Sequence, residues 1–127
     1  MRVIGAILLL VVLSTSAAFS QPRYSPETLA KRESQWMKDS LHLNTDQFNK
    51  VIRVNLDYSK GVNQYRPLPQ SDQHTKALKD LITKKNDALK KVLTKEQFRK
   101  YYKREQEQET IEREKEQNNN TGRHKPL

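Results

Sequence analysis

LNTDQF at residues 43–48 is repeated fifty residues later as LTKEQF at residues 93–98, and these two stretches decide the fold of the chain. Leucine, glutamine and phenylalanine are identical in the two copies. Asparagine is replaced by threonine and aspartate by glutamate, so the chemistry of those positions is retained. Each copy has the residues of a helix start, and the sequence therefore predicts that one helix leads directly into the next at both places.

The positions within each copy have separate capping roles. The second residue, Asn44 or Thr94, is an N-cap whose side-chain oxygen accepts from a free amide of the first helical turn. The glutamine three residues later reaches back to the cap amide and completes a capping box, while the leucine and the phenylalanine form a hydrophobic staple. The eight residues to which we assign these capping roles are Leu43, Asn44, Gln47, Phe48, Leu93, Thr94, Gln97 and Phe98.

The pattern outside the two copies is also helical. Lys, Glu, Gln, Leu and Arg dominate from residue 25 onward, and Ser25-Pro26 is a typical helix start. Apolar residues at three- and four-residue steps predict helices over about 26–40, 44–66, 72–92 and from 94 onward. The predicted fold class is all-α, with about four helices in an elongated, hairpin-like arrangement.

The apolar stripes are interrupted in the middle and stop early in the last helix. Asn55 and Lys85 stand inside otherwise apolar faces, and we expect Lys85 to extend along its stem to water. Between residues 103 and 117 only Ile111 is large and apolar, so this part of the helix needs a partner or frays. Residues 118–127 are expected to form a disordered polar tail.

The first twenty residues are typical of a cleavable signal peptide. Arg2 gives a positive start, residues 3–13 are almost entirely apolar, and Ala18-Phe19-Ser20 is a small-x-small cleavage site. The apolar run is shorter than the roughly 20 residues of a spanning helix, although an uncleaved anchor is the alternative. We expect export to the periplasm, cleavage after Ser20, a helical domain over residues 21–117, and no membrane span in the mature chain.

Charge and composition restrict the partners. The chain has 24 basic and 15 acidic residues, a net charge of +9 and no cysteine. Export argues against nucleic acid as a partner, which leaves acidic proteins, anionic lipids and unfolded chains for a basic surface. Leu, Ile, Val and Phe are scarce after residue 20, below the roughly 20% at which chains tend to disorder. A homodimer that shares its apolar surface is the simplest compensation.

The sequence contains no pattern typical of an enzyme or a metal site. His42, His74 and His124 have no second ligand at helical spacing, and P-loop and nucleophile-elbow motifs are absent. A solvated loop explains the closeness of Ser71, Asp72 and His74 better than a catalytic triad does. We therefore expect no enzymatic activity, no catalytic residue, no cofactor and no metal site.

The repeated stretch also resembles a known family. Leu-Thr-x-x-Gln at 93–97 matches the motif of the LTxxQ (Spy/CpxP-like) family of small periplasmic helical proteins, and the first copy departs from it only by Asn44. The likeness covers residues 26–105. It implies an elongated dimer. Spy-like members hold unfolded clients without ATP on a positive, partly apolar face, and other relatives sense metal or stress and modulate an envelope signalling system.

Three hypotheses about function follow. The first is a periplasmic holdase for unfolded or misfolded envelope proteins, the second is a metal or stress sensor that regulates an envelope signalling system, and the third is a structural surface protein without clients. For the first, apolar residues at the edges of the helical stripes are the candidate client contacts. These are Trp36, Met37, Val54, Leu56, Tyr58 and Tyr65.

Overall fold

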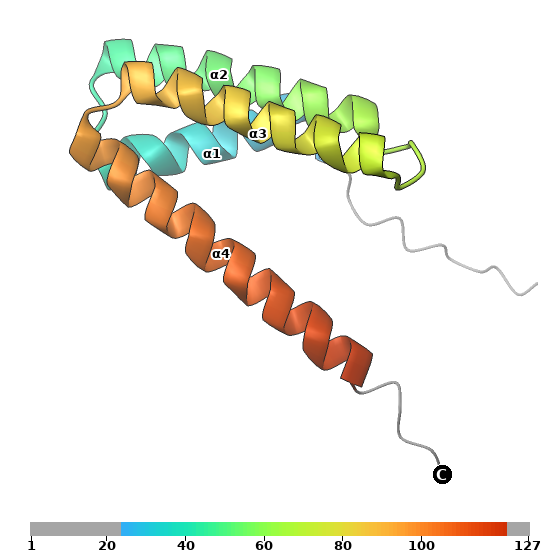
Figure 1. Cartoon of the computed structure of the whole chain (residues 1–127). Coiled ribbons are helices and arrows are strands. Elements are labelled where there is room, and N and C mark those ends of the chain that lie inside the picture. The colour runs from blue at the N-terminus through green and yellow to red at the C-terminus, as the bar shows by residue number, and fades with distance from the viewer. Residues whose placement is uncertain (1–23, 122–127) are drawn as a thin grey trace, which may run out of the picture.

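The computed structural model describes residues 24–121, and these form four α-helices (Figure 1). The helices are α1 (Pro26–Leu41), α2 (Thr45–Tyr65), α3 (Asp72–Val92) and α4 (Lys95–Thr121). The predicted all-α fold is confirmed. The predicted signal peptide and residues 122–127 lie outside the described residues.

Helices α1, α2 and α3 form one body, from which α4 diverges. Helix α2 packs against both α1 and α3, and α4 touches α1 and α3 near its start. Figure 1 shows α1 to α3 running roughly alongside one another, whereas α4 leaves them at an angle and extends away. None of the described helices has the length and apolar character needed to cross a membrane.

Local capping fixes where the first and third helices begin. Ser25 accepts from the amide of Thr28 with Pro26 in the first turn, and Ser71 accepts from the amide of His74. Helix α1 ends at His42, which is left-handed (φ 55°), and its amide donates to the carbonyl of Lys38. This single left-handed residue turns the chain between the end of α1 and the start of α2.

The core is small and lies where the four helices meet. Seven apolar residues pack together with little or no exposure: Met37, Leu41, Leu43, Val51, Leu89, Leu93 and Tyr101. Gly61 lets α2 and α3 approach closely, because a Cβ there would lie 2.7 Å from the Leu81 Cδ2 atom. The seven core residues lie mostly at the end of the molecule that holds the two repeated stretches.

Three predictions need correction. Met37, expected at an exposed edge, is fully buried in the core, because the α1 face that carries it packs against α2. Lys85, expected to extend to water, is only 8% exposed. Helix α4 continues to Thr121, so residues 118–121 of the expected disordered tail are helical.

Candidate functional site

Both repeated stretches form complete capping boxes. The backbone N–H of Gln47 donates to the Asn44 Oδ1 atom (2.8 Å), and the backbone N–H of Asn44 donates back to Gln47 Oε1 (3.2 Å). At the second copy the Gln97 N–H donates to Thr94 Oγ1 (3.2 Å), and the Thr94 N–H donates to Gln97 Oε1 (3.0 Å). The first amides of α2 and α4 are thus satisfied by side chains.

The same two glutamines also bind the opposite copy. The Gln47 Nε2 group donates to the Val92 carbonyl (3.2 Å) at the end of α3 and to Gln97 Oε1 (2.8 Å). The Gln97 Nε2 group donates to the Leu41 carbonyl (3.1 Å) at the end of α1. Gln47 therefore caps the start of α2 and binds the end of α3. Gln97 caps the start of α4 and binds the end of α1.

The leucines and phenylalanines of the motif close this junction. Leu43 and Leu93 are each 7% exposed, and Phe48 and Phe98 are half-buried against the core. A lysine ammonium lies over each phenylalanine ring, with Lys38 4.7 Å from the Phe48 centroid and Lys90 5.4 Å from the Phe98 centroid. The two copies come together as near-equivalent halves of one joint.

A charged contact fixes the direction of α4. Arg104 donates to both carboxylate oxygens of Glu33 on α1 (3.0 and 3.1 Å), and its guanidinium lies 3.5 Å from the centroid of the Trp36 ring. The Arg104 and Glu33 side chains are about three-quarters buried. Stacking of a flat cation on an aromatic ring is typical of arginine rather than lysine.

Next to it, Lys85 is enclosed by aromatic rings. Its Nζ atom lies 4.7 Å from the Tyr58 ring centroid and 5.4 Å from that of Tyr101. Burial raises the pKa of the Glu105 carboxyl above its usual value, and the positive charge of Lys85 offsets part of that shift. Burial likewise raises the pKa of the Tyr101 phenol, whose hydroxyl donates to Asn86 Oδ1 (3.3 Å).

Asn55 and Ser34 are two further polar residues that are buried in the described chain. The Asn55 Nδ2 group donates to Ser34 Oγ (2.9 Å) and contacts the Met37 sulfur (3.5 Å), whereas its Oδ1 atom is buried with no hydrogen-bond partner among the described residues. The contact joins α1 to α2 through a hydrogen bond rather than apolar packing alone.

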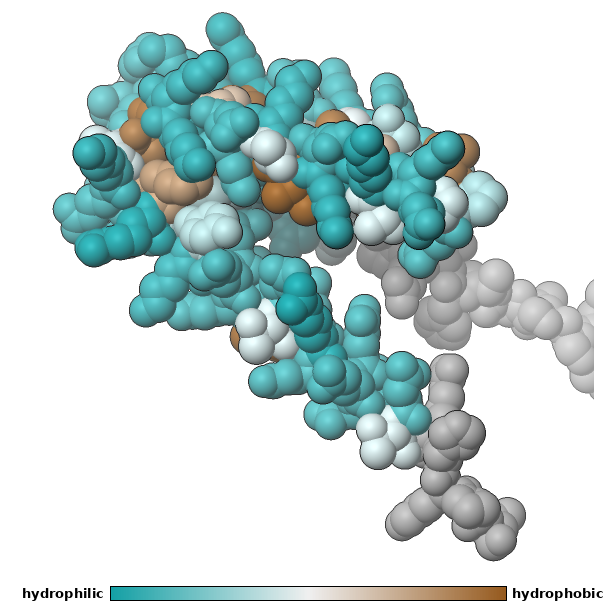
Figure 2. Space-filling view, viewed as in Figure 1, coloured by the Kyte–Doolittle hydropathy of each residue, from teal (hydrophilic) through white to brown (hydrophobic). Residues whose placement is uncertain are grey.

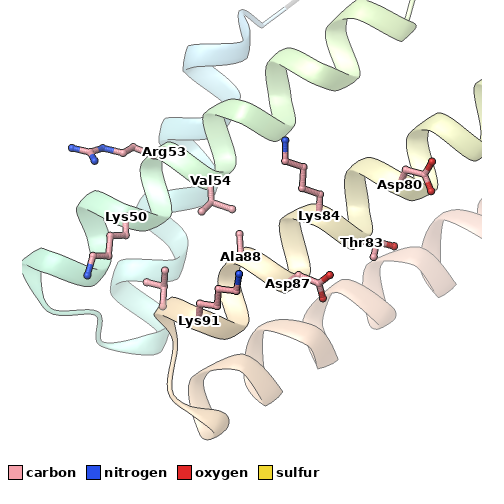
Figure 3. Close-up of a pocket in the computed structure, with 10 residues that line it drawn as sticks. Lys50, Arg53, Val54, Asp80, Thr83, Lys84, Asp87, Ala88 and Lys91 are labelled. Atoms are coloured by element: carbon pink, nitrogen blue, oxygen red, sulfur yellow. The ribbon is translucent and has the colours of Figure 1, made fainter.

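A groove of about 700 Å³ opens between α2 and α3 (Figure 3). Its apolar floor contains Val54, Ala88 and Val92. Seven further residues line its rim and ends. Four are basic, namely Lys50, Arg53, Lys84 and Lys91, and the other three are Asp80, Thr83 and Asp87. Lys50 pairs with Asp46 (2.7 Å), but the other three cations form no ion pair with any residue of the described chain.

The candidate client contacts are dispersed. Val54 lines the groove, and Tyr58 lines the small cavity beside it. Trp36 is covered by Arg104, and Tyr65 stacks edge-on with His74 at the far end of α2. Leu56 is half-buried but does not line the groove. Of the six candidate residues, the structure thus places two, Val54 and Tyr58, in or beside the groove. The sequence did not predict the flanking cations, because they lie at exposed positions on two separate helices.

No three His, Cys, Asp or Glu side chains gather in a metal-binding arrangement within residues 24–121. His74 instead makes a hydrogen bond from its Nε2 atom to the Tyr65 carbonyl (2.8 Å) across the loop between α2 and α3. His42 is the left-handed residue that ends α1. His124 lies outside the described residues.

Comparison with known proteins yields a family match. The model of a family described as Domain of unknown function (DUF4890) matches residues 16–101. The matched range contains both repeated stretches, α1 to α3 and the first turns of α4. No curated protein and no solved structure matches the chain.

Proposed function

This chain belongs to the family described as Domain of unknown function (DUF4890), and from its own geometry we propose that it is an exported, ATP-independent holdase. Its clients are unfolded or misfolded envelope proteins. The observation that carries the proposal is the α2/α3 groove, in which an apolar floor lies beside Arg53, Lys84 and Lys91, three cations without an ion-pair partner among residues 24–121.

The groove suits segments that are both acidic and apolar. Arg53, Lys84 and Lys91 attract negative charge over about 10 Å at 0.1 M salt, which speeds encounter with a client. Val54 and Ala88 then offer apolar contact without a deep pocket, so that varied sequences fit. Figure 2 shows brown apolar patches among teal side chains over the α1–α3 body, whereas α4 is mostly teal.

The repeated stretches support this proposal by positioning the groove. Val92 closes one end of the floor, and its carbonyl is held by Gln47 of α2. The joint therefore fixes α2 against α3 where the groove ends. Paired helix starts in a basic chain also support the likeness to the LTxxQ family and, with the N-terminal pattern, a periplasmic location. We further propose that the chain forms a homodimer, because few apolar residues are buried within one chain.

The test measures suppression of client aggregation without nucleotide, using an acidic client diluted from denaturant. Val54→Thr removes apolar floor and Arg53→Gln removes one rim charge, and both should protect the client less than wild type does. Ile111→Thr and Arg99→Gln are the matched controls, because both residues lie exposed on α4 away from the groove. Melting curves establish that each variant is folded.

Added salt should slow client capture by wild type more than by Arg53→Gln. If wild type protects no client at any ionic strength, the holdase proposal fails. The sensor hypothesis, in which the same surface binds a component of an envelope signalling system, then takes its place.

A further inference from the structure

The distal part of α4 carries an acidic stripe. Glu105, Glu109, Glu112 and Glu116 follow one another at three- and four-residue steps, so they lie on one helical face. This face continues the one that packs on the body through Tyr101. Its first three glutamates line a hollow of about 420 Å³ that opens between α3 and α4.

Glu105 is partly buried against the body, but nothing within residues 24–121 covers the rest of this stripe. Helix α4 diverges from the body toward its C-terminal end (Figure 1), and Glu109, Glu112 and Glu116 are exposed. Glu109 pairs with Arg113 on the same helix, while Glu112 and Glu116 form no ion pair with the described residues. A long charged helix without tertiary contacts is marginal in water, and a partner would stabilise it.

The groove has four basic lining residues against two acidic ones, Asp80 and Asp87, so on balance it matches this stripe in charge, and it also matches it in spacing. Lys84 and Lys91 are one heptad apart on α3, and so are Glu109 and Glu116 on α4. A heptad of α-helix rises about 10.5 Å, so the two pairs of charges can meet when the helices lie alongside each other. Lys50 and Arg53 line the groove from α2, across from Lys84 and Lys91 of α3 (Figure 3).

We propose that the acidic face of α4 in one copy of this protein docks into the α2/α3 groove of a second copy. Within one chain α4 contacts α1 and α3 near its start and diverges from the body, so it does not lie in the α2/α3 groove of its own chain. A helix lying in a groove is a common recognition mode. The apolar floor adds contact with the stems of the glutamates and with exposed Tyr102 of the same α4 face. This pairing does not rest on the holdase proposal.

Charge reversal with rescue tests the pairing by sedimentation equilibrium of the purified protein at low salt. The helix variant is Glu109→Lys with Glu116→Lys, and the groove variant is Lys84→Glu with Lys91→Glu. Each variant alone places like charges against each other and should self-associate about tenfold or more weakly than wild type. An equimolar mixture should associate like wild type, because every helix then meets a groove of opposite charge.

Glu107→Lys with Glu114→Lys is the control for the helix variant. These glutamates are also one heptad apart and exposed, but they lie on the opposite face of α4, and Glu107 likewise has a local lysine partner. The control should associate as wild type does. The proposal is overturned if wild type stays monomeric, if the mixture associates no better than its components, or if the control fails equally. Self-association that survives all reversals would assign the dimer to a different surface.

Discussion

The Gln47 Nε2 group donates a 2.8 Å hydrogen bond to Gln97 Oε1, so the two motif glutamines, fifty positions apart, join the starts of α2 and α4. Each side chain has both of its polar atoms engaged, with the oxygen on its own helix cap and the amino group across the joint. A shorter polar residue would reach neither the cap nor the neighbouring helix end. The joint thus depends on glutamine at both positions.

The first prediction is that these two residues act as a unit. Gln47→Ala and Gln97→Ala should each lower the free energy of unfolding by about 1–2 kcal/mol, because each leaves helix-end groups without partners. The double variant should lose less than the sum, by at least about 0.5 kcal/mol, since either single change already breaks the shared bond. Chemical denaturation of the four proteins measures this. Gln64→Ala, on an exposed position of α2, is the control, and strictly additive losses would contradict the shared joint.

The sequence predicts the capping boxes of this joint but not the contact between its two glutamines. Cap and glutamine spacing predicts each box, because a capping box is local and needs only the residues of one turn. The Gln47–Gln97 contact requires α2 and α4 to start side by side, which depends on packing along the whole of α1 and α3. The sequence therefore predicted two helix starts but not the bond that joins them.

Lys85 shows the opposite case, in which a general expectation fails. A lysine in an apolar stripe usually extends to water, but here Tyr101 from α4 covers the position and Tyr58 closes its other side. The groove was half predicted. Val54 was recognised as an edge residue, whereas the cations beside it became a site only when α2 and α3 were placed together.

The second prediction concerns the anchor of α4. Arg104→Lys keeps a cation that can pair with Glu33 but loses the flat contact of the guanidinium with Trp36. We expect a loss of about 1 kcal/mol in unfolding free energy, and faster amide exchange in the first turns of α4. Arg99→Lys, at an exposed position one turn earlier, should change neither quantity. Equal exchange in both variants would mean that packing of Tyr101 alone holds α4 in place.

The third prediction follows from the raised pKa of the Glu105 carboxyl, on which Lys85, Glu33, Arg104 and Glu112 act as neighbouring charges. Because the folded chain holds this proton to a higher pH than the unfolded chain does, the contribution of Glu105 to stability falls as pH rises through its folded pKa. Once the carboxyl is ionised in the folded chain as well, the partly buried charge opposes folding in full. Glu105→Gln should therefore melt above wild type at pH 7.

That difference in melting temperature should shrink as the pH is lowered toward about 4, the ordinary range of a glutamate, where wild-type Glu105 is itself protonated. Glu114→Gln, exposed on the other face of α4, is the control for the loss of one negative charge. A Glu105→Gln variant that is less stable than wild type at pH 7 would show that attraction to Lys85 outweighs the cost of burial.

The last prediction joins the two proposals, because a client and the α4 helix of a second copy would compete for one groove. Client protection per chain should then fall as the protein concentration rises through the range of self-association. The helix variant Glu109→Lys with Glu116→Lys leaves every groove residue in place but cannot fill the groove of another copy. It should protect clients as well as wild type at low concentration and better than wild type at high concentration. The groove variant Lys84→Glu with Lys91→Glu should protect poorly at every concentration, because it lacks the charges that attract the client. Aggregation measured across a dilution series, alongside sedimentation of the same samples, separates the outcomes. If the helix variant loses protection as fully as the groove variant does, the associated form is the one that holds clients, and the groove is not where they bind.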